Sequence, residues 1–229
     1  MPPWVVSVAV GMAASAALGG VAYRARSIDA RGVGAGIAVG SAVYVGAGWR
    51  GFLCLATFFV LGTLATRVGR AAKGSHGART AGHVLANGLI PAVAAVVAVT
   101  APEHGPRALA ALAGALAAAT ADTLSSEIGQ VYGGRPYLLT EFRPVPVGEN
   151  GGVTLVGSLA GVGGAAALAA VAVMLGVTGH AAPVVVGGLA GNVVDSVLGA
   201  TLERRGRMSN AGVNLGCTLA GGLVAAVMA

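Results

Sequence analysis

The chain alternates between long apolar runs and short polar stretches, and most of the apolar runs have the length of a membrane-spanning helix. A helical span needs about 20 residues, with a usual range of about 17–25. Eight runs can be drawn, at residues 4–22, 32–48, 51–66, 83–100, 107–129, 152–178, 183–202 and 212–228. The run at 51–66 is short, which leaves seven spans as an alternative. The pattern predicts an all-α polytopic membrane bundle of about eight transmembrane helices.

Composition agrees with a membrane protein. Only 10% of the residues are charged and the mean hydropathy is +0.81, whereas a soluble domain carries about 25% charged residues. The 39 glycines favour close helix packing, because lipid provides no hydrophobic drive between helices. We expect one transmembrane domain over residues 1–229. A net charge of +6 can indicate a nucleic-acid binder, but the basic residues cluster in short loops, so we expect no nucleic-acid partner.

The distribution of Lys and Arg predicts how the helices are oriented. With the N-terminus outside and eight alternating spans, only Arg50 and Arg107 fall in outside loops. The inside loops hold Arg24, Arg26, Arg31, Arg67, Arg70, Lys73, Arg79, Arg135, Arg143, Arg204, Arg205 and Arg207. Cytoplasmic loops carry such an excess of basic residues. We therefore expect a multi-pass protein, in the plasma membrane if the source is prokaryotic, with the loop at 130–150 in the cytoplasm.

Two carboxylates interrupt the apolar runs. Asp122 and Asp195 each lie within a predicted span, where an ionised carboxylate persists mainly beside a protein interior, a cation or water. Helical spacing places Asp122, Ser125, Ser126 and Gly129 on one face, and Asn192, Asp195, Ser196 and Gly199 on another. Oxygen ligands of this kind suit a hard divalent cation such as Mg²⁺. The alternative is that each aspartate pairs with an arginine or caps polar backbone.

Further polar residues reach the same side of the membrane. The stretch 148–152 is rich in glycine, which lets backbone N–H groups approach phosphate at the start of the next helix. Its spacing matches neither the Rossmann nor the Walker loop, and an ordinary turn is an alternative. Thr154 adds a hydroxyl, and Arg135 and Arg143 could neutralise phosphate charge or only anchor the loop. The convergence of these residues predicts a cytoplasm-facing site.

Four sequence blocks carry a family resemblance. They are ADTLSSEIG at 121–129, VPVGENGGV at 145–153, DSVLGA at 195–200, and Asn210 followed by Val213-Asn214. In this order they resemble the polytopic membrane family that includes plant phytyl-phosphate kinase. The chain departs from that pattern at Leu124-Ser125, where Trp-Ala is usual, and at Glu149, where Thr is usual. It is also distantly similar to CTP-dependent polyprenol kinases and to CDP-diacylglycerol synthases.

The resemblance implies a membrane enzyme of lipid metabolism that uses a nucleotide, with CTP as phosphate donor and Mg²⁺ or Mn²⁺ as cofactor. The expected transferase is a kinase that converts an isoprenyl monophosphate, such as phytyl or geranylgeranyl phosphate, to the diphosphate. Asp122 and Asp195 would hold the metal and Glu127 would assist catalysis. The expected phosphate- and nucleotide-binding residues are Ser126, Arg135, Arg143, Gly148, Asn150, Gly151, Gly152, Thr154, Asn192, Ser196, Asn210 and Asn214.

Two other functions stay open at this point. One is a cytidylyltransferase that makes a CDP-lipid, and the other is an ion-coupled transporter in which Asp122 and Asp195 form the ion site. The lipid phosphate, the nucleotide and the membrane are the expected partners, and a homodimer is compatible with the chain.

Overall fold

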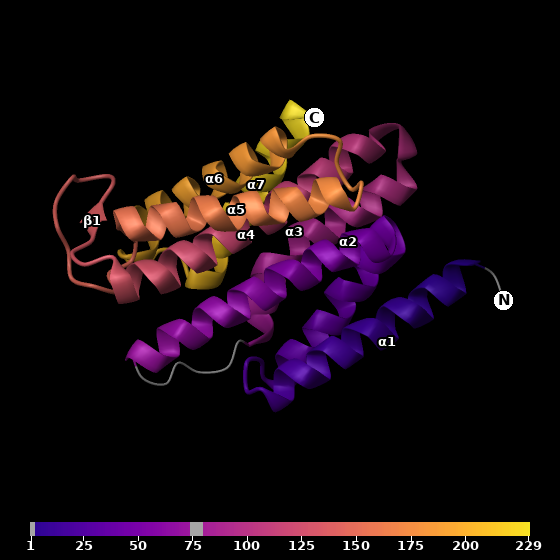
Figure 1. Ribbon diagram of the computed structural model, residues 1–229, viewed down its shortest axis with the longest axis horizontal. Coiled ribbons are helices and arrows are strands. Elements are labelled where there is room, and N and C mark those ends of the chain that lie inside the picture. The colour runs from indigo at the N-terminus through magenta and orange to yellow at the C-terminus, as the bar shows by residue number, and fades with distance from the viewer. Residues whose placement is uncertain (1–2, 74–79) are drawn as a thin grey trace.

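The computed structural model describes residues 3–73 and 80–229, and within them seven helices are long and apolar enough to cross a membrane. These are α1 (Pro3–Arg24), α2 (Ala30–Lys73), α3 (Ala81–Thr100), α4 (Gly105–Tyr132), α5 (Leu155–Met174), α6 (Ala181–Leu198) and α7 (Asn210–Met228). Figure 1 shows them as one bundle. The prediction of an all-α polytopic membrane bundle is confirmed. Arg79, assigned above to an inside loop, lies outside the described residues.

The longest helix, α2, contains two of the predicted runs. Its backbone leaves helical geometry at Gly48, where φ is 65° and ψ is −168°, a conformation that glycine adopts without a Cβ clash. The rings of Tyr44 and Phe52 pack edge to face with centroids 5.9 Å apart. Along a straight helix these positions would be about 12 Å apart. The chain therefore folds back at Gly48, and the runs 32–48 and 51–66 are the two arms of one helical hairpin.

Helix α4 forms the centre of the bundle. It contacts α2, α3, α5, α6 and α7, and its residues from Leu112 to Ala121 are buried. Small residues permit this crowding: a Cβ on Gly221 of α7 would lie 2.6 Å from the Ala118 Cβ and 2.9 Å from the Gly114 carbonyl oxygen. Close packing through small residues is how membrane helices associate. Helix α1 packs on α2 at the edge of the bundle.

Most of the basic residues lie in or next to the connections at one end of the bundle, which we call the basic end. The α1–α2, α4–α5 and α6–α7 connections lie at this end, together with the last residues of α2 and the first residues of α3 (Figure 1). The bend of α2, the α3–α4 connection through the short helix η1 (Pro102–His104), the α5–α6 connection, the start of α1 and the end of α7 lie at the opposite end. This arrangement matches the predicted alternation of spans. That the basic end faces the cytoplasm remains a prediction.

Thiol labelling tests that orientation. Gly179 is exposed in the α5–α6 loop, and Arg205 is exposed in the α6–α7 loop at the basic end. In a background lacking Cys54 and Cys217, we expect Gly179→Cys to react with an impermeant maleimide added outside intact cells. Arg205→Cys should be protected from the same reagent. Both should react after permeabilisation, which controls for accessibility. The reverse pattern in intact cells would contradict the charge-based topology.

Candidate functional site

A polar cavity opens at the basic end of the bundle, among the ends of α2 to α7. Its volume is about 390 Å³. Of the predicted site residues, the structure brings Asp122, Ser126, Glu127, Gly148, Asn150, Gly151, Gly152, Thr154, Asn192, Asp195, Ser196, Asn210 and Asn214 to its wall. Glu149 and Glu203 raise the number of carboxylate side chains there to five, whereas no Lys or Arg lines the wall in the described part of the chain.

The two predicted stripes meet at the wall of this cavity. The Ser125 hydroxyl on α4 lies 3.1 Å from the Asn192 Oδ1 on α6 and donates to it. On α4 the Ser126 hydroxyl donates to Asp122 Oδ1 at 3.4 Å. Helix α5 makes room for this contact at Gly161, where a Cβ would lie 3.0 Å from the Asn192 side-chain nitrogen. Asp122 and Asp195 thus belong to one site, although they are 73 residues apart in the chain.

Asp195 has the surroundings of a cation ligand. Its Oδ1 atom is buried and has no hydrogen-bond partner among the described residues, and the charged groups that act on it are the carboxylates Asp122 and Glu203. Within residues 3–73 and 80–229 no arginine pairs with it, so for Asp195 the structure does not have the ion pair considered above. A buried carboxylate oxygen of this kind needs a partner, which a cation or water supplies.

The described residues contain no cluster of three or more His, Cys, Asp or Glu side chains positioned around one point. A metal held by Asp122 and Asp195 would therefore take most of its ligands from water, amide or hydroxyl oxygens and phosphate. Mg²⁺ is bound in this way, through one or two carboxylates plus substrate phosphates, so the residues present fit this ion.

The glycine-rich loop closes one side of the cavity. Strands β1 (Tyr137–Leu138) and β2 (Gly152–Val153) pair antiparallel, and the loop between them turns with positive φ at Gly148 (88°) and Gly151 (77°). A Cβ on Gly151 would overlap the backbone of Ala200 in η2 (Gly199–Glu203), the π-helical continuation of α6. Close approach to α6 therefore explains the glycine at 151. Thr154 caps α5, because its hydroxyl accepts from the Gly157 N–H at 3.0 Å.

Arg204 ties this loop to the end of α6. Its guanidinium lies 3.1 Å from a Glu141 carboxylate oxygen and 3.3 Å from a Glu149 carboxylate oxygen. Arg143 also pairs with Glu141. The hydrogen bond from Arg143, with the charges of Arg143 and Arg204, lowers the pKa of the exposed Glu141 carboxyl below its usual value. These contacts hold the outer part of the loop in place.

The structure does not bring Arg135 or Arg143 to the cavity wall. Arg143 is taken up by Glu141 on the outer part of the loop, and Arg135 is exposed. The ion pair of Arg143 with Glu141 therefore stabilises the structure of the loop. A phosphate-neutralising role for these two arginines stays a prediction.

The cavity also contains residues that the sequence patterns did not single out. Thr66 from α2, with His83 and Asn87 from α3, extend its wall beyond α4–α7. The four histidines of the chain show no metal-ligand spacing, and so none was assigned a role. The i, i+4 relation of His83 and Asn87 on the first turns of α3 was the available signal, since it places two polar side chains on one face.

Comparison with known proteins identifies the family. The family model described as Integral membrane protein DUF92 matches residues 13–222. The chain is 36% identical over 214 residues to the uncharacterized membrane protein MJ0933 of Methanocaldococcus jannaschii. The aligned region covers 88% of this chain and 85% of the relative.

Two plant relatives align with most of the chain. Protein VTE6, chloroplastic, of Arabidopsis thaliana is 30% identical over 77% of this chain and 56% of its own length. Protein PGR of the same plant is 31% identical over 80% of this chain and 75% of its own length. No solved structure matches the chain. The resemblance seen in the sequence blocks is confirmed, and the chain belongs to the DUF92 family of integral membrane proteins.

Proposed function

We propose that the protein is a membrane-embedded kinase that transfers the γ-phosphoryl group of CTP to an isoprenyl monophosphate and so forms the isoprenyl diphosphate. The observation that carries this proposal is the cavity wall, which has five carboxylates, one of them Asp195 with a buried Oδ1 atom that has no hydrogen-bond partner among the described residues. Two phosphorylated substrates carry the same sign of charge as these carboxylates, so cations are needed for both substrates to bind in the cavity. Bound metal ions are how phosphoryl-transfer enzymes meet this requirement.

The reaction needs little proton chemistry from the protein. An oxygen of the lipid monophosphate attacks the γ-phosphorus of CTP, the bond from that phosphorus to the β–γ bridging oxygen breaks, and CDP leaves. A monoester phosphate has a second pKa of about 6, so the attacking oxygen is already deprotonated at neutral pH. Catalysis then depends on positioning and on charge stabilisation, which are the main contributions in phosphoryl transfer.

The residues of the cavity can be assigned to those two tasks. Asp122 and Asp195 would hold Mg²⁺, which when bound neutralises the phosphate oxygens and keeps them in line. Glu127 lies about one and a half turns nearer the membrane surface than Asp122, where it would face the nucleotide. In the 148–152 loop the N–H groups of Glu149 and Gly152 donate to backbone carbonyls. The candidate donors to phosphate and base are therefore the N–H groups of Gly148, Asn150 and Gly151, together with the side chains of Asn192, Asn210 and Asn214.

The cavity geometry favours an enzyme over an ion-coupled transporter. The polar wall belongs to one end of the bundle, and α4 continues beyond it as a buried apolar segment from Leu112 to Ala119. A transport pathway needs polar surface on both sides of the ion site. Among the described residues the polar groups of the cavity wall extend from the basic end into the bundle as far as Asp122 on α4 and Asn192 on α6.

Product analysis tests the proposal. Purified protein is incubated with farnesyl, geranylgeranyl or phytyl phosphate, Mg²⁺ and each nucleoside triphosphate in turn, and products are identified by mass. We expect the lipid diphosphate and CDP, greatest turnover with CTP, loss of turnover with EDTA, and recovery with Mg²⁺ or Mn²⁺. A CDP-lipid with released pyrophosphate would establish the cytidylyltransferase instead. Absence of any product, with metal-dependent ion flux in proteoliposomes, would establish the transporter.

A further inference from the structure

A second cavity lies beside the polar one, between α1, both arms of α2 and the start of α3. Its wall is almost entirely apolar and includes Leu18, Val33, Val39, Phe52, Leu55 and Phe58. With a volume of about 80 Å³, it is much smaller than the polar cavity. We call this space the apolar slot.

The apolar slot and the polar cavity share part of their walls. His83 and Asn87 on the first turns of α3 line both spaces. The Asn87 side-chain nitrogen donates to the His83 carbonyl oxygen at 3.1 Å, and the His83 Nδ1 lies 2.9 Å from the Thr80 hydroxyl. These contacts hold both side chains at the junction. The two spaces are therefore adjacent, an arrangement that suits a ligand with one polar end and one apolar end.

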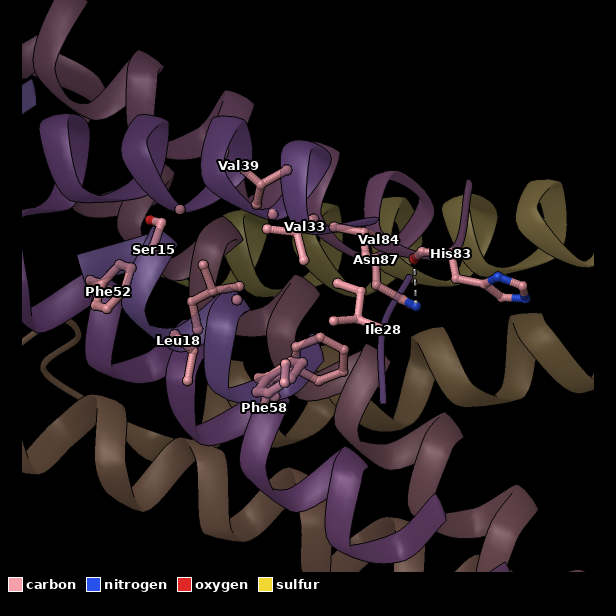
Figure 2. Close-up of a pocket in the computed structure, with 17 residues that line it drawn as sticks. Ser15, Leu18, Ile28, Val33, Val39, Phe52, Phe58, His83, Val84 and Asn87 are labelled. Carbon is pink, nitrogen blue, oxygen red and sulfur yellow. Dashed lines mark hydrogen bonds between the residues drawn. The ribbon is translucent and has the colours of Figure 1, made fainter. Parts of the chain in front are cut away.

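The slot extends from this junction into the bundle. Figure 2 shows His83 at one end, Ile28, Val84 and Val33 next to it, and Ser15 with Phe52 at the other end. On the first arm of α2 the wall runs from Val33 to Gly40, which corresponds to about 10 Å along the helix. At the far end Gly40 packs against Ser15 and Phe52, because a Cβ on Gly40 would overlap the Ser15 hydroxyl and lie 3.2 Å from the Phe52 ring.

We infer that the apolar slot binds the first part of the isoprenyl chain of the acceptor, while the phosphate of that acceptor lies in the polar cavity beyond His83 and Asn87. The inference rests on the proposed function for the identity of the headgroup. The small volume of the apolar slot suits one hydrocarbon chain rather than the two chains of a diacyl lipid. The shared wall residues place the start of that chain beside the phosphate site. Residues around Ser15 and Phe52 then determine which chains are accepted.

Gly36 offers a direct test, because it lines the slot and a Cβ built on it meets nothing within 4 Å. Gly36→Leu therefore fills the slot without a backbone clash. Gly34, two residues away on the same helix, also has open space around its Cβ position, but it is exposed and does not line the slot. Gly34→Leu is the matched control, with the same helix and the same added side chain.

The probe is a geranyl phosphate analogue that ends in a diazirine, irradiated with the full-length protein in detergent, with crosslinked peptides identified by mass spectrometry. We expect crosslinks in α1 and α2 around the slot, reduced roughly tenfold or more by Gly36→Leu, since small steric changes in an apolar pocket have effects of this size. Gly34→Leu should crosslink as the wild type does. Crosslinks outside the slot, or crosslinking unaffected by Gly36→Leu, would overturn the inference.

A turnover series separates this inference from the proposed function. With dimethylallyl, geranyl, farnesyl and geranylgeranyl phosphates as acceptors, Gly36→Leu should lose turnover of the longer chains roughly tenfold or more while dimethylallyl phosphate is affected less. If no acceptor is phosphorylated by the wild type but crosslinks fall in the slot, the kinase proposal fails and the slot assignment stands. If diphosphate forms while crosslinks fall elsewhere, the slot assignment fails. It also fails if a membrane lipid fills the slot and the probe does not displace it.

Discussion

Asp122→Asn and Asp195→Asn should each lower the turnover of isoprenyl phosphate by about 10²–10³-fold, since loss of one group that stabilises transition-state charge has an effect of this order. Asparagine preserves the size of the side chain and removes the charge that a metal requires. The measurement is product formation at saturating Mg²⁺, together with metal-dependent nucleotide binding in detergent. Both should fall together.

Folding should survive these two substitutions. An amide costs less than a carboxylate in the membrane interior, so both variants should run as monodisperse protein in detergent with unchanged thermal stability or a small gain. Glu103→Gln is the control, because Glu103 is an exposed acidic residue of η1 at the opposite end of the bundle, and it should keep full turnover. Loss of folding without a separate loss of binding would assign the aspartates a structural role. Full turnover in either variant would remove that residue from the site.

Gly191→Val should destabilise the bundle by about 1–3 kcal/mol or more, the range for overpacking of a close-packed interior. Gly191 lies where α4, α6 and α7 meet, and a Cβ there would overlap the Ala118 Cβ and lie 2.5 Å from the Cys217 carbonyl oxygen. Since the Cys217 contact is backbone, it cannot be relieved by a change of rotamer. The measurement is thermal unfolding in detergent followed by size-exclusion chromatography.

Gly163→Val provides the matched control for that prediction. Gly163 lies within α5, is exposed, and a Cβ on it meets nothing within 4 Å. Both variants place a β-branched residue in a helix, so the difference between them reports on packing alone. Equal unfolding temperatures for the two variants would show that the α4–α6–α7 junction is looser than the structure has it.

Much of the fold could be predicted from local patterns. Apolar runs of sufficient length must be helices in a membrane, because every backbone N–H and C=O group has to be satisfied within the segment. The eight runs accordingly became seven helices, with two runs joined as the hairpin at Gly48. Helical periodicity also placed Asp122 with Ser126, and Asp195 with Asn192, on common faces.

The composition of the site depended on contacts that local patterns do not encode. Periodicity says which residues share a helix face, but not which faces meet, so the Ser125–Asn192 contact between α4 and α6 was not predicted. The place of Arg143 in the loop left open whether it neutralises phosphate or only anchors the loop, and the folded loop pairs it with Glu141. The i, i+4 spacing puts His83 and Asn87 on one face of α3, but only the packing of α3 beside α2 and α4 brings that face to the cavity.

The sequence by itself determined the membrane class, the positions of the helices, the family and the two aspartates of the polar stripes, because hydropathy, period and motif spacing are properties of short segments. The tertiary structure decided the five-carboxylate wall, the role of Arg204 in holding the glycine-rich loop, and the junction of the polar cavity with the apolar slot. These features join residues from helices far apart in the chain. Which helices become neighbours depends on how closely small residues such as Gly114, Gly161 and Gly191 let the backbones approach. That approach is set only when all the helices pack together.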